Sequence, residues 1–214
     1  MADSGRSEGV TRLEAFSDGV MAIAITLLVL NLVVPSRAQL ALGHQTLAHA
    51  LVLLWPSYFA FVVSFLVVGI MWVNHHAMFS MARSVDRQVL FANLILLMIV
   101  SAVPFPTRLL AEYLTQGGAD AHVAAAVYSF TMLLASIAFV ILWLAMTRRP
   151  ELVRAGIDVV AARSSVRRFG AGLGAYLVTI GIAFISAPLT LVAHFALAVY
   201  YCFNHLGGEG PGDG

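Results

Sequence analysis

The 214-residue sequence has no lysine, a single cysteine and few charged side chains of any kind. Charged residues make up 11% of the chain and hydrophobic residues 60%, whereas soluble domains average about a quarter charged and about half apolar. A water-soluble fold would have to expose much of this apolar excess, so the composition excludes a typical soluble domain. The sequence therefore predicts a small all-α membrane protein with almost nothing outside the bilayer.

Other absences exclude whole classes of function. The net charge is only +1, although all twelve basic residues are arginine, so the strong basic excess of nucleic-acid-binding proteins is missing. One cysteine, Cys202, cannot form an internal disulfide or a thiolate cluster, and we expect a small buried side chain there. Neither His-Glu-x-x-His nor Gly-x-Ser-x-Gly occurs. We predict no enzymatic activity, no cofactor and no nucleic-acid partner.

Apolar blocks separated by polar residues indicate six membrane-spanning helices, each about 20 residues or somewhat longer. The expected helices are 16–34, 47–73, 89–110, 122–146, 169–187 and 188–206. The last two are divided at Pro188, because one helix over 169–203 would be about 52 Å long against a hydrocarbon core of about 30 Å. At Pro56, Pro104 and Pro106 we expect kinks rather than boundaries. Residues 1–206 are thus expected to form one six-helix transmembrane domain, followed by a Gly-rich, disordered tail at 207–214.

The arginines predict the orientation in the membrane. If the N-terminus is cytoplasmic, only Arg37 and Arg108 fall in outside segments, and the other ten are cytoplasmic. The positive-inside rule therefore favours both termini in the cytoplasm, in the plasma or inner membrane. The arginine-rich stretch 148–168 is expected to set this topology; contact with anionic lipid is the alternative, and the stretch also has the pattern of a short amphipathic helix.

The first helix has two different faces. At about 100° per residue, Asp18, Ala22, Ile25 and Val29 share one stripe. The roughly opposite stripe holds Phe16, Gly19, Ile23, Thr26, Leu27, Leu30 and Val34. A carboxylate at a membrane boundary is tolerated only when it is paired or hydrated, so we expect the Asp18 face to turn toward the chain's own bundle. The other face is then free to meet something else.

A polar cluster is expected at the cytoplasmic end of the first two helices. The second helix ends in Trp72-Val73-Asn74-His75-His76, at the level of Ser17 and Asp18. Charge and hydrogen-bond demands can be satisfied together by the following cluster. Its members are Arg12, Ser17, Asp18, Asn74 and one or both of His75 and His76. The alternative is that both histidines simply lie in the interfacial layer, with Trp72 as an anchor. A histidine in the cluster would also make it pH-sensitive.

These residues carry a resemblance to a known family. Arg12-Leu13-Glu14-Ala15-Phe16-Ser17-Asp18 matches the Arg-x-x-x-Phe-Ser-Asp signature of the transmembrane protein 175 family of potassium channels. The rest of the first helix, the Trp72–His76 segment and Pro104-Phe105-Pro106-Thr107 are also similar to segments of that family. The length resembles that of the prokaryotic members, which have one six-helix unit per chain and assemble as tetramers.

The resemblance implies a pore lined by the first helix of each copy, without the Thr-Val-Gly-Tyr-Gly filter of ordinary potassium channels, and this sequence lacks that string. It also implies that Ile23, Leu27 and Leu30 form hydrophobic rings and Thr26 a hydroxyl layer. Arg12, Phe16, Ser17 and Asp18 would anchor the helix instead of touching ions. The helical arithmetic independently places the four pore residues on one face. Without the resemblance, plain helix packing or lipid contact is the favoured explanation of that stripe.

We therefore expect a homotetrameric cation channel that passes potassium, has no bound metal beyond the permeating ion, and contacts only its own copies and membrane lipid. Rings of apolar side chains can gate such a pore by dewetting. The alternative is a secondary transporter of a small cation or solute. Transporters usually place polar groups around a midplane site, and here such groups are few, chiefly Thr26, Asn31 and Ser64.

Overall fold

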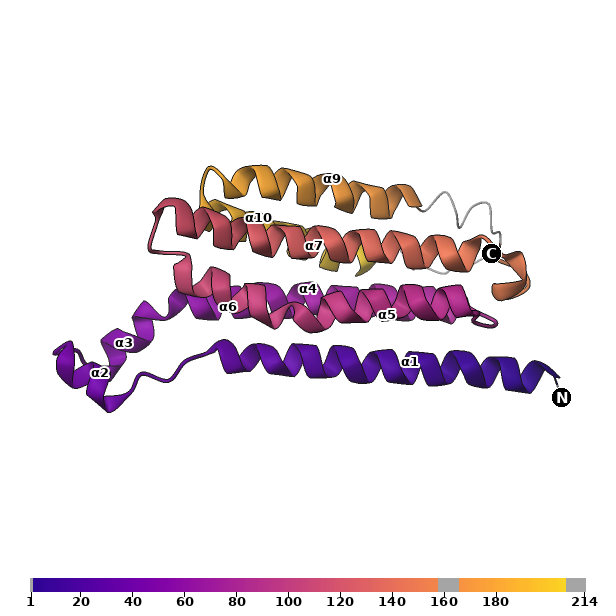
Figure 1. The fold of residues 1–214 in the computed structure, drawn as a ribbon, viewed down its shortest axis with the longest axis horizontal. Coiled ribbons are helices and arrows are strands. Elements are labelled where there is room, and N and C mark those ends of the chain that lie inside the picture. Colours follow the sequence, from indigo (N-terminus) through magenta and orange to yellow (C-terminus); the bar gives the residue numbers. More distant parts are fainter. Residues whose placement is uncertain (1, 158–165, 207–214) are drawn as a thin grey trace.

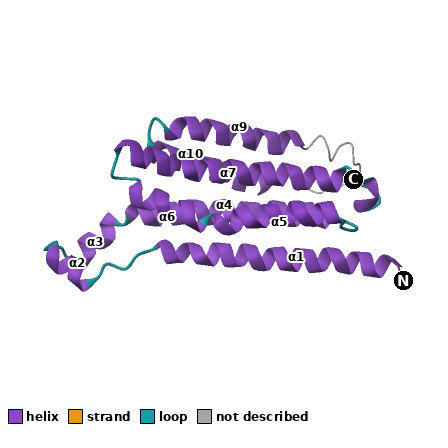
Figure 2. Ribbon diagram, viewed as in Figure 1, coloured by secondary structure: helices purple, strands orange, loops and turns teal. Residues whose placement is uncertain are grey.

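The computed structural model describes residues 2–157 and 166–206 and is a bundle of long helices (Figures 1 and 2). The expected tail at 207–214 and part of the arginine-rich stretch 148–168 lie outside these residues. The elements are, in order, α1 (Ala2–Leu27), the 3-10 helix η1 (Leu28–Asn31), α2 (Arg37–Leu42), α3 (Leu47–Leu53), α4 (Trp55–Ser80), α5 (Arg87–Ala102), α6 (Pro104–Tyr113), α7 (Gly118–Thr147), the 3-10 helix η2 (Pro150–Leu152), α9 (Val166–Ala183) and α10 (Ala187–Leu206). Every named element in the described residues is helical, so the all-α prediction is confirmed.

Within the residues that the structure describes, four helical stretches are long and apolar enough to cross a membrane. They are Glu8–Asn31, Trp55–Ser80, Arg87–Tyr113 and Gly118–Thr147. The apolar helices Gly172–Ala183 and Ala187–Phe203 are shorter. They meet close to the predicted break at Pro188, which lies in the first turn of α10. The count of six spans and the cytoplasmic placement of both termini stay predictions.

Pro56 and Pro104 have different effects on the helical backbone. The expected helix 47–73 is interrupted at Leu54, and α4 begins anew with Pro56 in its first turn, where a missing N–H removes no helical hydrogen bond. The expectation of a kink at Pro56 was therefore wrong: the chain has a helix boundary there. At Pro104 the helical path continues, because Val103 keeps helical backbone angles (φ −52°, ψ −38°) between α5 and α6.

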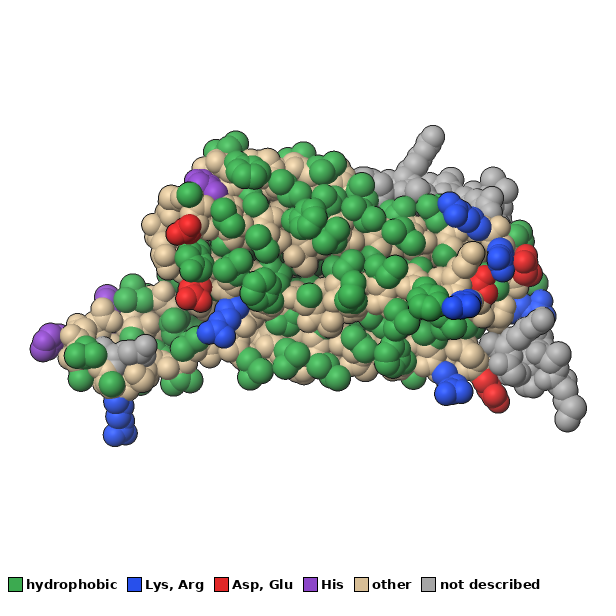
Figure 3. Space-filling view, in the orientation of Figure 1, with side chains coloured by type: hydrophobic (Ala, Val, Ile, Leu, Met, Phe, Trp, Pro, Cys, Tyr) green, Lys and Arg blue, Asp and Glu red, His purple; other side chains and the backbone are tan. Residues whose placement is uncertain are grey.

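Hydrogen bonds between loops stabilise the end of the bundle at which α1 begins. The Arg83 N–H donates to the Leu152 carbonyl (2.7 Å) and the Arg154 N–H to that of Met81 (3.0 Å), which joins the α4–α5 loop to the segment after α7. Asp86 accepts a hydrogen bond from the Val89 N–H (2.9 Å) as the N-cap of α5 and pairs with Arg149 (2.9 Å). Arginine side chains gather at this end of the bundle (Figure 3), as the distribution along the sequence predicts.

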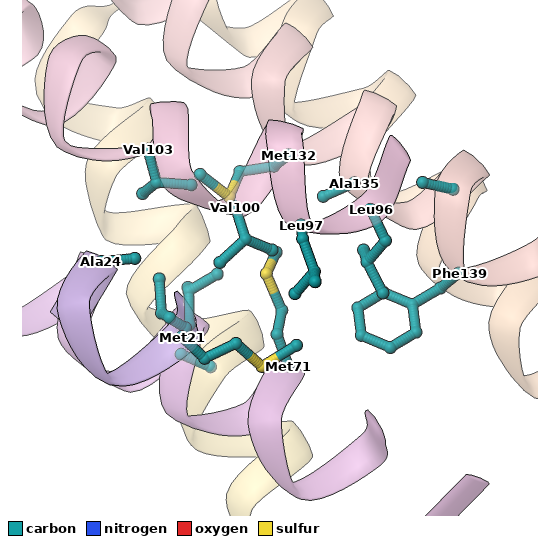
Figure 4. Packing of buried hydrophobic residues seen from close by; sticks show 14 of the residues in the cluster. Met21, Ala24, Met71, Leu96, Leu97, Val100, Val103, Met132, Ala135 and Phe139 are labelled. Carbon is teal, nitrogen blue, oxygen red and sulfur yellow. The ribbon is translucent and has the colours of Figure 1, made fainter. Parts of the chain in front are cut away.

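The core lies between α1, α4, α5 and α7 (Figure 4). Buried there are Met21 and Ala24 of α1, Met71 of α4, Leu96, Leu97 and Val100 of α5, and Met132, Ala135 and Phe139 of α7. Lipid tails are as apolar as these side chains, so close packing, rather than escape from water, holds such helices together in a bilayer. The core fixes which face of α1 points inward.

Candidate functional site: the free face of α1 and its anchors

The packed face of α1 differs from the one expected. Among the described side chains, the residues that α1 and η1 bury are Val10, Leu13, Ser17, Met21, Ala24, Leu28 and Asn31. Asp18 is only half-buried, Ala22 is exposed, and Val29 is 50% exposed. The expected inward stripe through Asp18 was therefore wrong; it lies along the flank of the packed face. The reason is that the Ser17 hydroxyl supplies the internal polar contact, while the carboxylate one residue later stays nearer the surface.

All four residues of the expected pore stripe are exposed in the single chain. Ile23 is 59%, Leu27 41% and Leu30 71% exposed. Thr26 is also exposed, and its hydroxyl donates to the Ile23 carbonyl (2.9 Å). At about 100° per residue, this apolar stripe is centred about 120° around the helix from the buried face, on the side away from Asp18. An exposed apolar surface of this kind calls for contact with lipid or with another chain.

A buried chain of hydrogen bonds holds the beginning of the α1 span. His75 of α4 donates from Nε2 to Asn93 Oδ1 of α5 (2.8 Å), and Asn93 Nδ2 donates to Ser17 Oγ (2.9 Å). Ser17 Oγ in turn donates to the Leu13 carbonyl (2.8 Å). Because the amide oxygen only accepts, His75 must carry its proton on Nε2. Three helices are thereby joined through side chains that are fully buried.

A second, more exposed layer surrounds this chain. Asp18 Oδ1 accepts from Trp72 Nε1 (2.9 Å), and His76 Nδ1 lies 2.8 Å from Glu14 Oε1. Phe16, another residue of the predicted cluster, is exposed. Arg12 is exposed and Asn74 half-buried. Among the described side chains no ion pair joins Arg12 to Asp18. The predicted polar residues therefore divide into a buried chain and a surface layer.

Asn93 was missed by the sequence analysis, although it joins Ser17 and His75. A signal was present, because Asn93 is the one polar residue in an otherwise apolar stretch from Val89 to Val100. A lone amide in a membrane-spanning helix usually has a partner on another helix. The sequence alone gave no basis for choosing that partner, since the register between helices depends on packing.

The C-terminal end of the α1 span has its own anchor. Asn31, 8% exposed at the end of η1, donates from Nδ2 to the Pro104 carbonyl at the start of α6 (3.1 Å). Elsewhere in the core, Thr107 donates to Ser64 (2.8 Å), which also contacts the Tyr128 hydroxyl (3.0 Å). This second network involves α4, α6 and α7 and leaves the free face of α1 untouched.

Side chains that bind metal ions are not clustered in the described part of this region. In the part of the chain that the structure describes, no three residues among His, Cys, Asp and Glu are grouped so that they could hold a metal ion. The single cysteine, Cys202, is half-buried on α10. What the site offers is an apolar stripe with one hydroxyl, held at both ends by buried amides.

Known proteins have similar sequences over most of the chain. Residues 12–104 match the family model described as endosomal/lysosomal potassium channel TMEM175. A protein of Streptomyces collinus described as a potassium channel is 55% identical over 195 residues, which are 91% of this chain and 92% of that protein. Another from Chamaesiphon minutus, also described as a potassium channel, is 41% identical over 204 residues, 95% and 98% of the two chains.

A solved structure is similar throughout. The crystal structure of a TMEM175 homologue from Chamaesiphon minutus, described as a lysosomal potassium-selective channel, superposes with a TM-score of 0.80 at 42% identity. The match covers 93% of this chain and 98% of that one. These relatives are described as channels and not as enzymes, in agreement with the prediction of a non-enzymatic protein. The resemblance drawn from the Arg12–Asp18 motif is confirmed: the chain belongs to the TMEM175 family.

Proposed function

We propose that this chain is one subunit of a homotetrameric, potassium-selective channel in the plasma or inner membrane, with both termini cytoplasmic. Its relatives are described as potassium channels. The observation that carries the proposal is the division of α1 into two faces. One face is buried and bonded to α4, α5 and α6, while Ile23, Thr26, Leu27 and Leu30 are left exposed.

A single α1 cannot enclose an ion path. Cyclic assembly repeats the helix around an axis, so that each exposed side chain becomes a ring. Rings of Ile23, Leu27 and Leu30 then narrow the path, and a narrow apolar tube holds water poorly, which makes the closed state easy to reach. No acidic side chain lies on this stripe, so cation preference would come from the Thr26 hydroxyls, from backbone carbonyls or from the width of the constriction.

The anchors have a mechanical task in this proposal. Ser17, Asn93 and His75 hold the cytoplasmic end of the stripe against α4 and α5, and Asn31 holds the outer end. Arg12, Phe16 and Asn74 lie near the cytoplasmic anchor and are available to a neighbouring copy. Permeating potassium is then the ion that the rings meet, and the six-helix unit of residues 1–206 needs no cofactor.

Purified protein reconstituted in liposomes tests the proposal. We expect potassium flux to exceed sodium flux, discrete single-channel steps in planar bilayers, and a mass in detergent equal to four chains. Protein-free liposomes measure the background leak. Slow, saturable counterflow without steps would instead identify a secondary transporter. A monomer or dimer as the sole species would contradict the ring of α1 helices.

A further inference from the structure

The last turn of the α1 span is wound differently from the rest. α1 is α-helical to Leu27, but Leu28–Asn31 form a 3-10 helix, which then ends at Leu32 in an extended conformation (φ −83°, ψ 94°). 3-10 turns are common at the ends of α-helices, and they change the direction in which the last side chains point. Here it contains Leu30, the outermost of the exposed stripe residues.

We propose that Asn31 is the positioning residue of the Leu30 ring: its hydrogen bond to the Pro104 carbonyl holds the end of the pore helix in the 3-10 form. This inference rests on the proposed function, because it assigns Leu30 to the pore. It goes further by naming the bond that sets the direction of the ring and by making η1 a hinge.

The burial pattern supports the role of the 3-10 winding. Side chains three residues apart eclipse one another in a 3-10 helix. Leu28 and Asn31, three apart, are both buried, and Leu27 and Leu30, three apart, are both exposed. In an α-helix each residue turns by about 20° less, so Asn31 would be about 60° away from the line of Leu28. The 3-10 winding is what brings the Asn31 amide to Pro104.

The same helical geometry predicts how loss of the Asn31–Pro104 hydrogen bond would move Leu30. Rewinding η1 as α-helix turns Leu30 by about 60° relative to Leu27 and shortens the segment by about 1.5 Å over three residues. Leu30 would leave its place above Leu27 and lie within about 20° of the line of Ile23, at the centre of the stripe. The outer ring would become narrower, while Ile23 and Leu27 would stay where they are.

Pro104 is suited to receive this bond. It begins α6, where α5 and α6 meet at Val103, and the same segment continues into Thr107, which is buried and bonded to Ser64. The carbonyl that accepts from Asn31 is therefore held by the core and not by a flexible loop. Because the Pro104 carbonyl is fixed, a change in this hydrogen bond would alter the winding of η1 and not the position of α6.

Cysteine accessibility tests the proposal, in a background in which the native Cys202 is replaced by alanine. Leu30→Cys and Ile23→Cys are each made with and without Asn31→Leu, which fills the site of the amide but cannot donate. A cationic methanethiosulfonate is applied during current recording. With Asn31→Leu we expect Leu30→Cys to react about tenfold faster and single-channel conductance to fall, while Ile23→Cys changes less than about twofold.

Two further variants separate positioning from stability. Ser129→Ala removes a buried hydrogen bond to His194 (2.9 Å) between α7 and α10, so it destabilises the bundle without touching η1, and the Leu30→Cys rate should not change. Val29→Ala favours α-helix at a half-exposed position while the Asn31 amide is kept, and it should raise the rate in the same direction by about twofold. This variant decides the question if Asn31→Leu fails to assemble.

The outcomes are distinguishable. Unchanged Leu30→Cys rates in the Asn31→Leu and Val29→Ala variants, with both parent cysteines still reducing the current, would overturn the role of Asn31 and leave the pore proposal standing. If neither cysteine affects the current in the parent channel, α1 does not line the path, and this inference falls with it.

Discussion

α1 and α7 are both long and apolar, yet they have different places in the bundle. In its most apolar 18-residue window, α7 has 50% of its residues buried, whereas the span that includes α1 has 28%. α7 contacts α5, α6, α9 and α10, while α1 packs mainly on α4 and α5 along one edge (Figure 1). The difference shows that hydropathy alone does not separate a core helix from one that has a free side.

The two helices are also held differently. α7 is held by close packing of residues such as Tyr128, Met132 and Leu142, all 0% exposed. α7 also has buried hydrogen bonds, from Tyr128 to Ser64 and from Ser129 to His194, but they add to packing against four other helices. α1 packs mainly on two helices, so it depends more on its two side-chain anchors, at Ser17 and at Asn31. α7 should therefore be sensitive to polarity and volume, and α1 to the loss of particular hydrogen bonds.

The largest effect should come from one substitution placed on each helix. Leu142→Asn puts an amide into a fully buried position of α7 where its demands for hydrogen bonds are unmet, and we expect a cost of about 3–5 kcal/mol and loss of assembled protein. Ile23→Asn puts the same amide on the exposed stripe, where we expect normal assembly and severalfold larger currents, because the ring becomes wet. Size-exclusion chromatography and reconstituted flux measure both.

The same two variants can contradict the difference between α1 and α7. Normal assembly of Leu142→Asn would mean that α7 has room for an amide, contrary to its burial. Unchanged currents in Ile23→Asn would place the stripe away from the ion path. Leu27→Asn serves as a second position on the same face, and its effect should have the same sign.

A smaller effect is expected at the anchor formed by Ser17, Asn93 and His75. Asn93→Leu removes two hydrogen bonds and leaves the His75 Nε2–H without an acceptor, while Ser17 keeps only its bond to the Leu13 carbonyl, so we expect a cost of about 2–4 kcal/mol. Thermal denaturation followed by the amount of tetramer left in solution measures the loss. Ser80→Ala removes only a bond to the carbonyl of Ala77 in its own helix and should be nearly neutral. Equal melting temperatures for both variants would show that the anchor is dispensable.

Sequence reasoning predicted what depends on local pattern. The apolar blocks gave the all-helical class, Pro188 gave the position of the break between α9 and α10 to within a few residues, and helical arithmetic gathered Ile23, Thr26, Leu27 and Leu30 on one face. It failed where neighbours decide the outcome. The inward face of α1 passes through Ser17 and Met21 instead of Asp18, because Asn93 and the core select those side chains.

The backbone at the prolines is a second feature that sequence reasoning could not predict. Pro56 and Pro104 both lie in the first turn of a helix, but the backbone differs just before them. Val103 keeps helical angles (φ −52°, ψ −38°), whereas Leu54 does not (φ −79°, ψ 7°). The difference depends on whether neighbouring elements support the backbone on both sides. α3 contacts little besides α4, whereas α6 packs on α4 and α7. Local sequence does not contain that information.

The smallest effect sharpens the role of Asp18. In the single chain its one described partner is Trp72 Nε1, at a partly exposed site, so Asp18→Ala and Trp72→Phe should each cost about 0.5–1 kcal/mol. If this bond is their whole contribution, the double variant costs no more than either single one, since a double-mutant cycle assigns the loss to the shared contact. Chemical or thermal unfolding of all four proteins gives the coupling free energy between Asp18 and Trp72.

A much larger cost for Asp18→Ala alone would mean that the carboxylate has another partner in the assembly. Arg12, exposed on the same helix, is the first residue to test. The Arg12→Ala variant should then lose the tetramer in parallel with Asp18→Ala while Trp72→Phe keeps it, and that pattern would make the surface layer of this anchor part of the interface between copies.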